Sequence, residues 1–122
     1  MIGYVTVGTN DLPRAAGFYD QLLGSIGGQR VFEESNCIGW SFGPAGAAFA
    51  VITPFNKEAA TVGNGVMVAF SVDEKRKVDS LYKFALSLGG TDEGAPGQRS
   101  PRFYAAYFRD LDGNKLEAYY MD

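Results

Sequence analysis

The chain has 122 residues, of which 46% are hydrophobic and 20% are charged, with a formal net charge of −3 at pH 7. This length and composition are typical of one compact domain that buries a core without disulfides or a structural metal. The small negative charge, spread along the chain, disfavours nucleic acid and anionic membrane surfaces as partners. The longest apolar run is far shorter than the roughly 20 residues that span a bilayer. With no secretory pattern at the start of the chain, we expect a cytoplasmic protein.

The absence of His is the most informative feature of the composition, and the only Cys is Cys37. A Ser-His-Asp triad, a Cys-His pair and the His-containing zinc motifs are therefore excluded within this chain. Cys37 has no partner for an intramolecular disulfide and no His to activate it, so we expect an inert buried thiol.

The first half of the chain predicts a strand, a helix and three further strands. Asn10-Asp11 supplies N-cap chemistry before Pro13, and apolar residues then recur at the three-to-four spacing of a helix over residues 12–23. Turn residues separate the β-prone segments. The predicted strands are residues 4–8, 29–34, 37–42 and 47–53.

The same order of elements restarts after a polar linker at about residues 55–64. Asp73 is the expected N-cap of a helix over residues 74–88, which Gly89-Gly90 ends. The predicted strands are residues 66–72, 91–95, 102–109 and 115–120. The repeated order indicates an internal duplication, with modules at about residues 1–54 and 65–122.

Side-chain alternation divides the predicted strands into two faces. One face is apolar and suited to packing beneath the helices: Val5, Val7, Val68, Phe70, Val72, Leu116, Ala118 and Tyr120. The other face is mixed, and such a set lines a ligand cavity better than it fills a core. Its members are Tyr4, Thr6, Met67, Ala69, Glu117 and Tyr119.

Three segments carry a family resemblance: "YVTVGTNDLPRAAGFYDQLLG", "GVMVAFSVDEKRKVDSLYKFALSLGG" and "FYAAYFRDLDGNKLEAYY". They resemble the vicinal oxygen chelate superfamily of glyoxalases, bleomycin-resistance proteins and extradiol dioxygenases. The most specific match is the turn at residues 110–114 followed by Glu117, which is similar to the family's "DPDGN" turn before a strand with a glutamate. The resemblance implies an α+β fold, a single domain over residues 1–122 in which two paired βαβββ modules with mixed sheets curl around a shared cavity.

The resemblance also implies four metal-ligand positions, which fall on Tyr4, approximately Ala50, Met67 and Glu117. Ala50 has no donor atom, the Met67 thioether suits soft ions, and a phenol with a pKa near 10 is a poor ligand at pH 7. Because metal sites normally need three or four protein ligands, we expect no metal and no cofactor.

Glu117 is the first candidate for a catalytic or ligand-binding group, and a structural salt bridge to Arg102 or Arg109 is the alternative. Aromatic residues on strands are more often core residues, but as a set they suit a bulky amphipathic ligand. The expected ligand-binding residues are Tyr4, Thr6, Trp40, Phe49, Met67, Tyr104, Tyr107, Glu117 and Tyr119.

Two functions from different classes follow from these features. The leading hypothesis is a metal-independent protein that binds a small organic molecule, and the resemblance adds that it acts as a homodimer. The competing hypothesis is an enzyme of the same superfamily, a lyase, isomerase or dioxygenase-like protein. It would use Glu117 as a base with Tyr4 as acid-base partner, or Glu117 as a divergent metal ligand. A third is an accessory domain that pairs with another protein.

Overall fold

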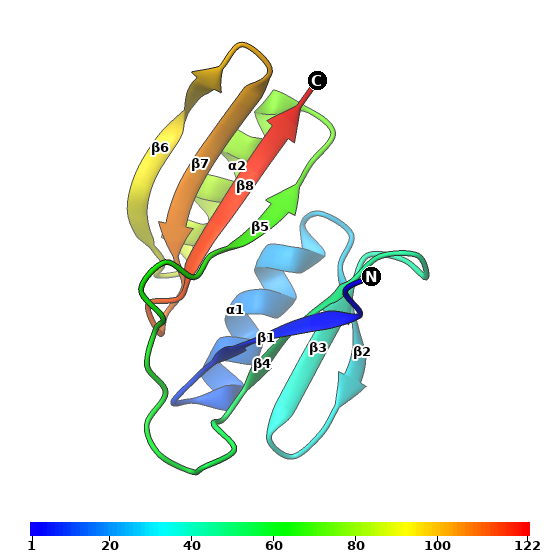
Figure 1. Ribbon diagram of the computed structural model, residues 1–122, viewed down its shortest axis with the longest axis vertical. Coiled ribbons are helices and arrows are strands. Elements are labelled where there is room, and N and C mark those ends of the chain that lie inside the picture. Colours follow the sequence, from blue (N-terminus) through cyan, green and yellow to red (C-terminus); the bar gives the residue numbers. More distant parts are fainter. The chain divides into compact units, whose positions relative to one another are not determined.

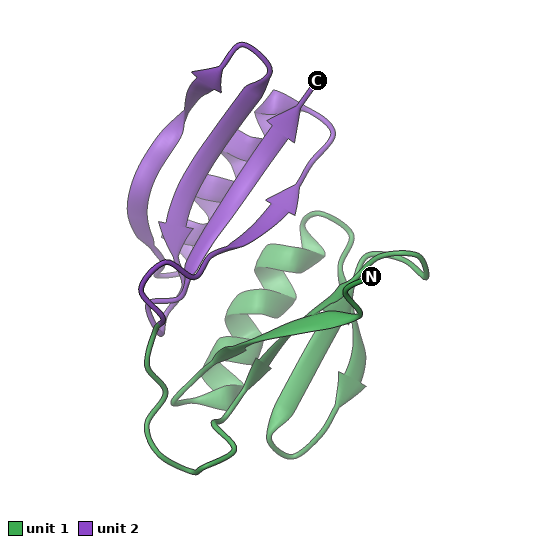
Figure 2. Ribbon diagram, viewed as in Figure 1, with its two compact units in different colours: residues 1–62 green, residues 63–122 purple.

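The computed structural model describes residues 1–122 as two compact units, residues 1–62 and 63–122 (Figure 1, Figure 2). Unit 1 consists of β1 (Tyr4–Gly8), α1 (Leu12–Gly24), β2 (Gln29–Glu33), β3 (Cys37–Ser41) and β4 (Ala48–Ile52). Unit 2 consists of β5 (Val68–Ser71), α2 (Lys75–Ser87), β6 (Thr91–Ser100), β7 (Phe103–Arg109) and β8 (Lys115–Met121). The predicted pair of βαβββ modules is confirmed. Neither helix is long and apolar enough to cross a membrane.

Both units build the same mixed four-stranded sheet, in the orders β1-β4-β3-β2 and β5-β8-β7-β6. In each unit the first strand pairs in parallel with the last strand, and the other pairs are antiparallel. A parallel pair needs a long crossover connection, and the helix lies within it. Each helix covers one face of its own sheet (Figure 1), and we call the opposite face the open face.

Helix α1 begins at the N-cap Asp11, whose carboxylate accepts a hydrogen bond from the backbone N of Arg14 at 3.1 Å. The ring of Tyr19 packs against Trp40 and Phe49 on the sheet, at centroid distances of 5.7 and 4.7 Å. Trp40 is only 1% exposed and Phe49 only 3%. Both were expected among the ligand-binding residues, but their side chains face α1 and form the hydrophobic core of unit 1.

Asp20 ties α1 to two strands of its sheet. The guanidinium of Arg30 on β2 donates two hydrogen bonds to its carboxylate at 2.9 and 2.7 Å, and the indole Nε1 of Trp40 on β3 donates a third at 2.9 Å. The hydrogen bonds from Arg30 contribute most to holding the pKa of Asp20 below its usual value. The carboxylate therefore stays ionised and fixes β2 and β3 against the helix.

The open face of unit 1 carries the aromatic side chains of Tyr4 and Phe32. The ring of Phe32 lies directly over Gly39, where an added Cβ would collide with it. Phe32 also meets the ring of Tyr4 edge to face, with centroids 5.9 Å apart. Gly39 is paired in register with Ala50 on β4. The centre of this face is thus formed by Gly39 and Ala50, which have the two smallest side chains, with the Phe32 ring beside them.

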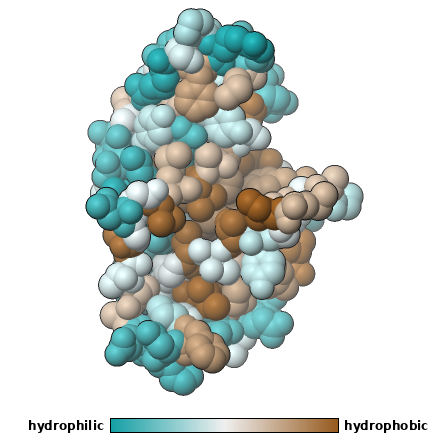
Figure 3. Space-filling view, in the orientation of Figure 1, coloured by the Kyte–Doolittle hydropathy of each residue, from teal (hydrophilic) through white to brown (hydrophobic).

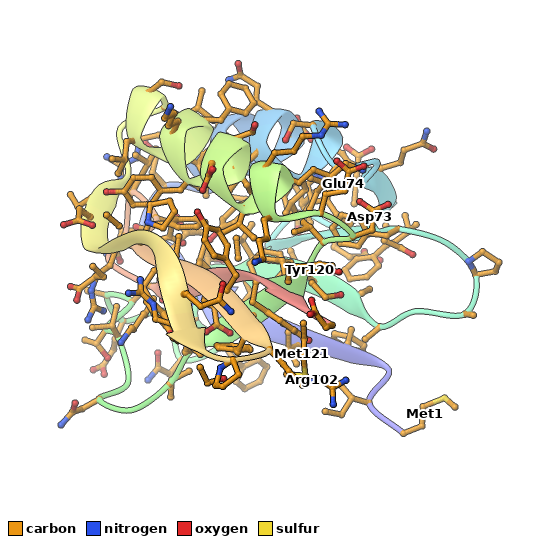
Figure 4. The ribbon with its side chains drawn as sticks, turned by 90° about the horizontal axis from the view of Figure 1, so that it is seen from above. Met1, Asp73, Glu74, Arg102, Tyr120 and Met121 are labelled. Carbon is orange, nitrogen blue, oxygen red and sulfur yellow. The ribbon has the colours of Figure 1, made fainter.

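Helix α2 begins one residue later than predicted. Its N-cap is Glu74, and Asp73 instead forms an ion pair with Lys77, one turn further along, at 2.7 Å. Asp73 and Glu74 lie at the start of the helix in Figure 4. The prediction of Asp73 as the cap was therefore wrong, because its carboxylate has a cationic partner at the i+4 position.

Tyr104 belongs to the helix side of unit 2. Its hydroxyl donates a hydrogen bond to the carboxylate of Asp79 on α2 at 2.7 Å, and the ammonium of Lys75 lies 5.7 Å from its ring centroid. The Asp79 carboxylate is the main cause of a raised Tyr104 pKa. Tyr104, another expected ligand-binding residue, therefore joins the helix to β7.

Strand β6 is twice as long as predicted, because Gly94, Pro96 and Gly97 interrupt the β-prone pattern around residue 95. It lies at the edge of its sheet, and its register with β7 shifts at three places. An edge strand tolerates Pro because one row of its N–H groups has no ladder partner to lose, and bulges accommodate glycines.

We expect Gly39→Ala to lower the free energy of unfolding by about 1–3 kcal/mol, because the new methyl group collides with the Phe32 ring in a packed region. Gly46→Ala is the matched control, since a Cβ there meets nothing within 4 Å, and it should change stability by less than about 0.5 kcal/mol. Urea unfolding of both variants measures the difference. Equal stabilities would contradict this placement of Phe32.

Candidate functional site

The turn between β7 and β8 is built on the carboxylate of Asp110. One carboxylate oxygen accepts hydrogen bonds from the backbone N of Asp112 and of Asn114, both at 2.9 Å, and the other accepts from the Asn114 amide at 2.9 Å. Gly113 adopts a φ of 90°, in the left-handed region that favours glycine. These contacts fix the turn, and through it the register of the strand that carries Glu117.

Glu117 lies in the centre of the unit 2 sheet. On β8 it is paired with Tyr107 of β7 on one side and with Ala69 of β5 on the other. Its neighbours Leu116 and Ala118 are fully buried among the residues beneath α2, so alternation directs Glu117 to the open face. Glu117 is 5% exposed. The sequence-predicted carboxylate is therefore a buried group on the face opposite the helix.

Tyr107 is the phenol next to this carboxylate. Burial is the first cause of its raised pKa, and the hydrogen-bonding and charge interactions with Glu117 are the next. A raised pKa keeps the phenol protonated at neutral pH, so that it donates to the carboxylate rather than competing with it. The pair offers an acceptor and a donor within one cross-strand contact.

The predicted salt bridge from Glu117 to Arg102 or Arg109 is wrong. Arg109 donates to the carboxylate of Glu93 at 2.7 Å and to the carbonyl of Gly113 at 2.8 Å. Arg102 donates to the backbone carbonyl of Asp122, and it lies beside Met121 at the end of β8 (Figure 4). Each arginine has a partner closer to its own position on the sheet, so neither neutralises Glu117.

Two cations that the sequence analysis missed lie on the same ring. The guanidinium carbon of Arg99 on β6 is 5.3 Å from the ring centroid of Tyr107, and the ammonium of Lys115 on β8 is 5.4 Å from it. Lys115 was detectable, because it is two residues before Glu117 and shares its face. Arg99 was not, because the predicted strand stopped at residue 95.

The structure distributes the expected ligand-binding residues over four places. Tyr107, Glu117 and Tyr119 share the open face of unit 2, where Tyr119 packs on Phe103 with ring centroids 5.4 Å apart. Tyr4 and Thr6 are exposed on β1 of unit 1. Met67 is 39% exposed and immediately precedes β5. The remaining members lie on the helix sides of their sheets: Trp40, Phe49 and Tyr104.

The residues at the four metal-ligand positions do not fit a divalent ion. Ala50 is fully buried and has no donor atom, and the phenol ring of Tyr4 packs on Phe32. Met67 contributes only a thioether, so Glu117 is the single hard ligand of the set. No group of three or more His, Cys, Asp or Glu residues is placed to hold a metal ion.

Cys37 is a buried thiol in β3. Burial is the main cause of its raised pKa, and the charge of Glu34 adds to it. The unreactive protonated form is therefore favoured, since the thiolate is the nucleophile.

Comparisons with known proteins give a consistent result. The family model for the Glyoxalase/Bleomycin resistance protein/Dioxygenase superfamily matches residues 1–118. The solved structure of a glyoxalase/bleomycin resistance protein from Albidiferax ferrireducens T118 is 34% identical, with a TM-score of 0.91 over 100% of this chain and 99% of that chain. No curated protein matches.

More distant structures share the fold alone. A glyoxalase/bleomycin resistance protein/dioxygenase family enzyme from Burkholderia phytofirmans PsJN is 21% identical, with a TM-score of 0.79 over 98% of each chain. A lactoylglutathione lyase from Agrobacterium tumefaciens is 20% identical, with a TM-score of 0.73 over 98% of this chain and 92% of that chain.

We expect Asp110→Ala to lower the free energy of unfolding by about 2–4 kcal/mol, because it leaves three hydrogen-bond donors of the buried turn without their acceptor. Asp73→Ala is the control, since Asp73 forms an exposed ion pair, and it should cost much less stability. Thermal or urea unfolding measures both. If the two variants lose the same stability, the turn does not depend on Asp110.

Proposed function

The chain belongs to the Glyoxalase/Bleomycin resistance protein/Dioxygenase superfamily, and we propose that it binds a small organic molecule on the open face of unit 2 without the help of a metal ion. One observation carries the proposal: the buried carboxylate of Glu117 lies opposite the phenol of Tyr107, on the sheet face that α2 does not cover.

A structural role does not account for Glu117. The residue forms no ion pair, and its nearest neighbours in the ladder are Tyr107 and Ala69. Burying a carboxylate costs free energy that an apolar residue at the same place would not incur. An ionised carboxylate offers about four acceptor sites, more than one phenol uses. The remaining sites suit the hydrogen-bond donors of a ligand.

The aromatic residues of the same face suit the apolar part of such a ligand. The rings of Phe103 and Tyr119 pack on each other, tilted by 31° at a centroid distance of 5.4 Å. Binding sites for small molecules typically combine such apolar walls with a few fixed polar groups. An amphipathic molecule with at least one hydrogen-bond donor matches this combination.

Metal independence is supported by the donor set. Glu117 is the only residue among the four family ligand positions with a carboxylate, and structural and catalytic metal sites normally have at least three protein ligands. The ligand would therefore meet the carboxylate itself rather than an ion bound to it.

The second candidate function is proton transfer. The pair of Glu117 and Tyr107 places a carboxylate base beside a protonated phenol, as general acid-base catalysis requires. Tyr107 replaces Tyr4 in this role, because β7 places its phenol directly opposite Glu117 in the sheet, whereas Tyr4 packs on Phe32. The substrate would lose a proton to Glu117 and gain one from Tyr107.

We also propose that the protein is a homodimer in the cytoplasm. Large apolar side chains are exposed, among them Ile2, Val66 and Met67, and brown hydrophobic side chains interrupt the polar surface in Figure 3. Exposed apolar surface of this kind supports association of two copies about a two-fold axis. A lone reduced thiol supports a reducing compartment.

We expect Glu117→Gln to weaken ligand binding by about 10- to 100-fold, because the variant keeps the shape but removes the charge of a hydrogen-bond acceptor. The ligand comes from a thermal-shift screen of dicarbonyls, catechols and glycopeptide antibiotics, and calorimetry then measures its affinity. Glu34→Gln, at an exposed site in unit 1, is the control and should bind like the unaltered protein.

The same experiment separates binding, catalysis and metal dependence. Chelator-treated protein should bind with unchanged affinity, and NMR should find the ligand chemically unaltered after prolonged incubation. Turnover that both Tyr107→Phe and Glu117→Gln abolish would establish the acid-base enzyme instead. One equivalent of tightly held transition metal, or binding that chelator removes and metal restores, would overturn metal independence.

Light scattering should give a mass of about twice the 13.2 kDa of one chain. Replacing Met67, an exposed apolar residue, by Lys should shift the mass toward that of one chain if this part of the surface lies in the dimer contact. A single-chain mass for the unaltered protein at high concentration would contradict the dimer.

A further inference from the structure

Arg99 and Lys115 are two cationic side chains on the open face of unit 2, and neither forms an ion pair. Both instead lie within 5.4 Å of the ring centroid of Tyr107. Several other cations have carboxylate partners: Arg30, Arg76, Lys77 and Arg109. Glu117, on the same face as Lys115, forms no ion pair with either cation. Two like charges therefore lie close to the Tyr107 ring, whose phenol interacts with the Glu117 carboxylate.

The irregular shape of β6 holds Arg99 in this position. Its guanidinium donates to the backbone carbonyl of Ala95, four residues earlier, at 2.5 Å. Gly94 makes the close approach possible, because a Cβ there would lie 3.0 Å from the Tyr107 ring and 3.6 Å from the Arg99 guanidinium. The side chain is thus folded back over its own strand toward β7 instead of extending into solvent.

This arrangement leaves most of the binding capacity of both cations unused. A guanidinium has five N–H donors, and Arg99 hydrogen-bonds the carbonyl of Ala95 and the phenol of Tyr107, so other donors remain for a ligand. The ammonium of Lys115 has three donors, and its contact with the face of Tyr107 is cation–π. Fixed donors of this kind are pre-organised, so less conformational freedom is lost when a ligand binds.

We propose that Arg99 and Lys115 form a subsite for an anionic group of the ligand, a carboxylate or a phosphate, above the ring of Tyr107. The proposal rests on the proposed function, since it names the chemical class of molecule that the open face of unit 2 binds. An aromatic or otherwise flat part of the ligand adjoins Tyr107, and a hydrogen-bond donor of the ligand is directed to Glu117. The two cations and the one carboxylate thereby select an anion that also carries a donor.

Three simple compounds test the subsite. Benzoate and phenyl phosphate carry the two kinds of anion on the same ring, and benzamide is the neutral isostere of benzoate. NMR titration of the full chain at millimolar concentrations should show tighter binding of at least one anion than of benzamide. The chemical shifts that change should include those of Arg99, Tyr107 and Lys115. The tighter anion identifies the carboxylate or the phosphate.

Charge-removing variants supply the second arm. Arg99→Gln and Lys115→Gln should each weaken binding of the preferred anion by about five- to tenfold, the effect of losing one charge-assisted contact, and should leave benzamide unchanged. Arg76→Gln removes an exposed cation at the start of α2 and is the matched control with no expected effect. Arg99→Lys keeps the charge and should retain part of the affinity. Unfolding curves show whether each variant is folded. If Arg99→Gln does not fold, Lys115→Gln decides the test.

The outcomes separate this subsite from the proposed function. If benzamide and both anions bind with equal affinity and Glu117→Gln weakens the binding of all three compounds, the anion subsite is refuted. The proposal that ligands bind on the open face of unit 2 is then retained. If the anions bind more tightly but Arg99→Gln and Lys115→Gln bind them like the unaltered protein, the subsite is also refuted. If no ligand of any class binds on this face, both proposals fall.

Discussion

The side chains of β8 alternate between two environments, and the rest of the site depends on this alternation. Leu116 and Ala118 are fully buried beneath α2, which forces Glu117 between them to the opposite face. A register shift of one residue would place the carboxylate under the helix and expose the leucine, at a large cost in desolvation. The Asp110 turn acts against that shift because it fixes the point at which β8 begins.

The same backbone pattern gives a different result in the first repeat. On β4, Phe49 and Val51 are buried on the helix side, and Ala50 occupies the place that corresponds to Glu117. Phe32 then covers the adjacent Gly39. A duplicated fold therefore has one sheet whose open face carries Ala50 and Gly39 beside the Phe32 ring, and one whose open face keeps charged groups. The polar chemistry of the chain is concentrated in the second repeat.

The fold was predictable because hydrophobic periodicity and turn residues agree along most of the chain. The helix expected over residues 12–23 is Leu12–Gly24, and the one expected over residues 74–88 is Lys75–Ser87. Both helices have regular apolar stripes and glycines near their ends, so local signals and packing favour the same bounds. The expected cap at Asp73 failed because an ion pair competes for that carboxylate.

The candidate site was only partly predictable, because a site depends on which face each side chain joins. Glu117 was found through the turn before it, but Tyr104 and Tyr107 could be separated only once the register of β7 was known. Trp40 and Phe49 were chosen for their aromatic character, and their contacts with Tyr19 place them in the core. Arg99 lies against the Tyr107 ring because β6 contains bulges, and no periodic pattern in the sequence predicts them.

The bulges and the proline of β6 also affect the tendency of the chain to aggregate at high protein concentration. A long, flat edge strand presents a regular row of backbone groups to which another chain can add, and this is a common route to aggregation. Pro96 removes one donor from that row, and three register shifts break its spacing. The sheet of unit 2 is therefore protected from extension at β6, and substitution of Pro96 by a β-branched residue would make this edge a better template for intermolecular pairing.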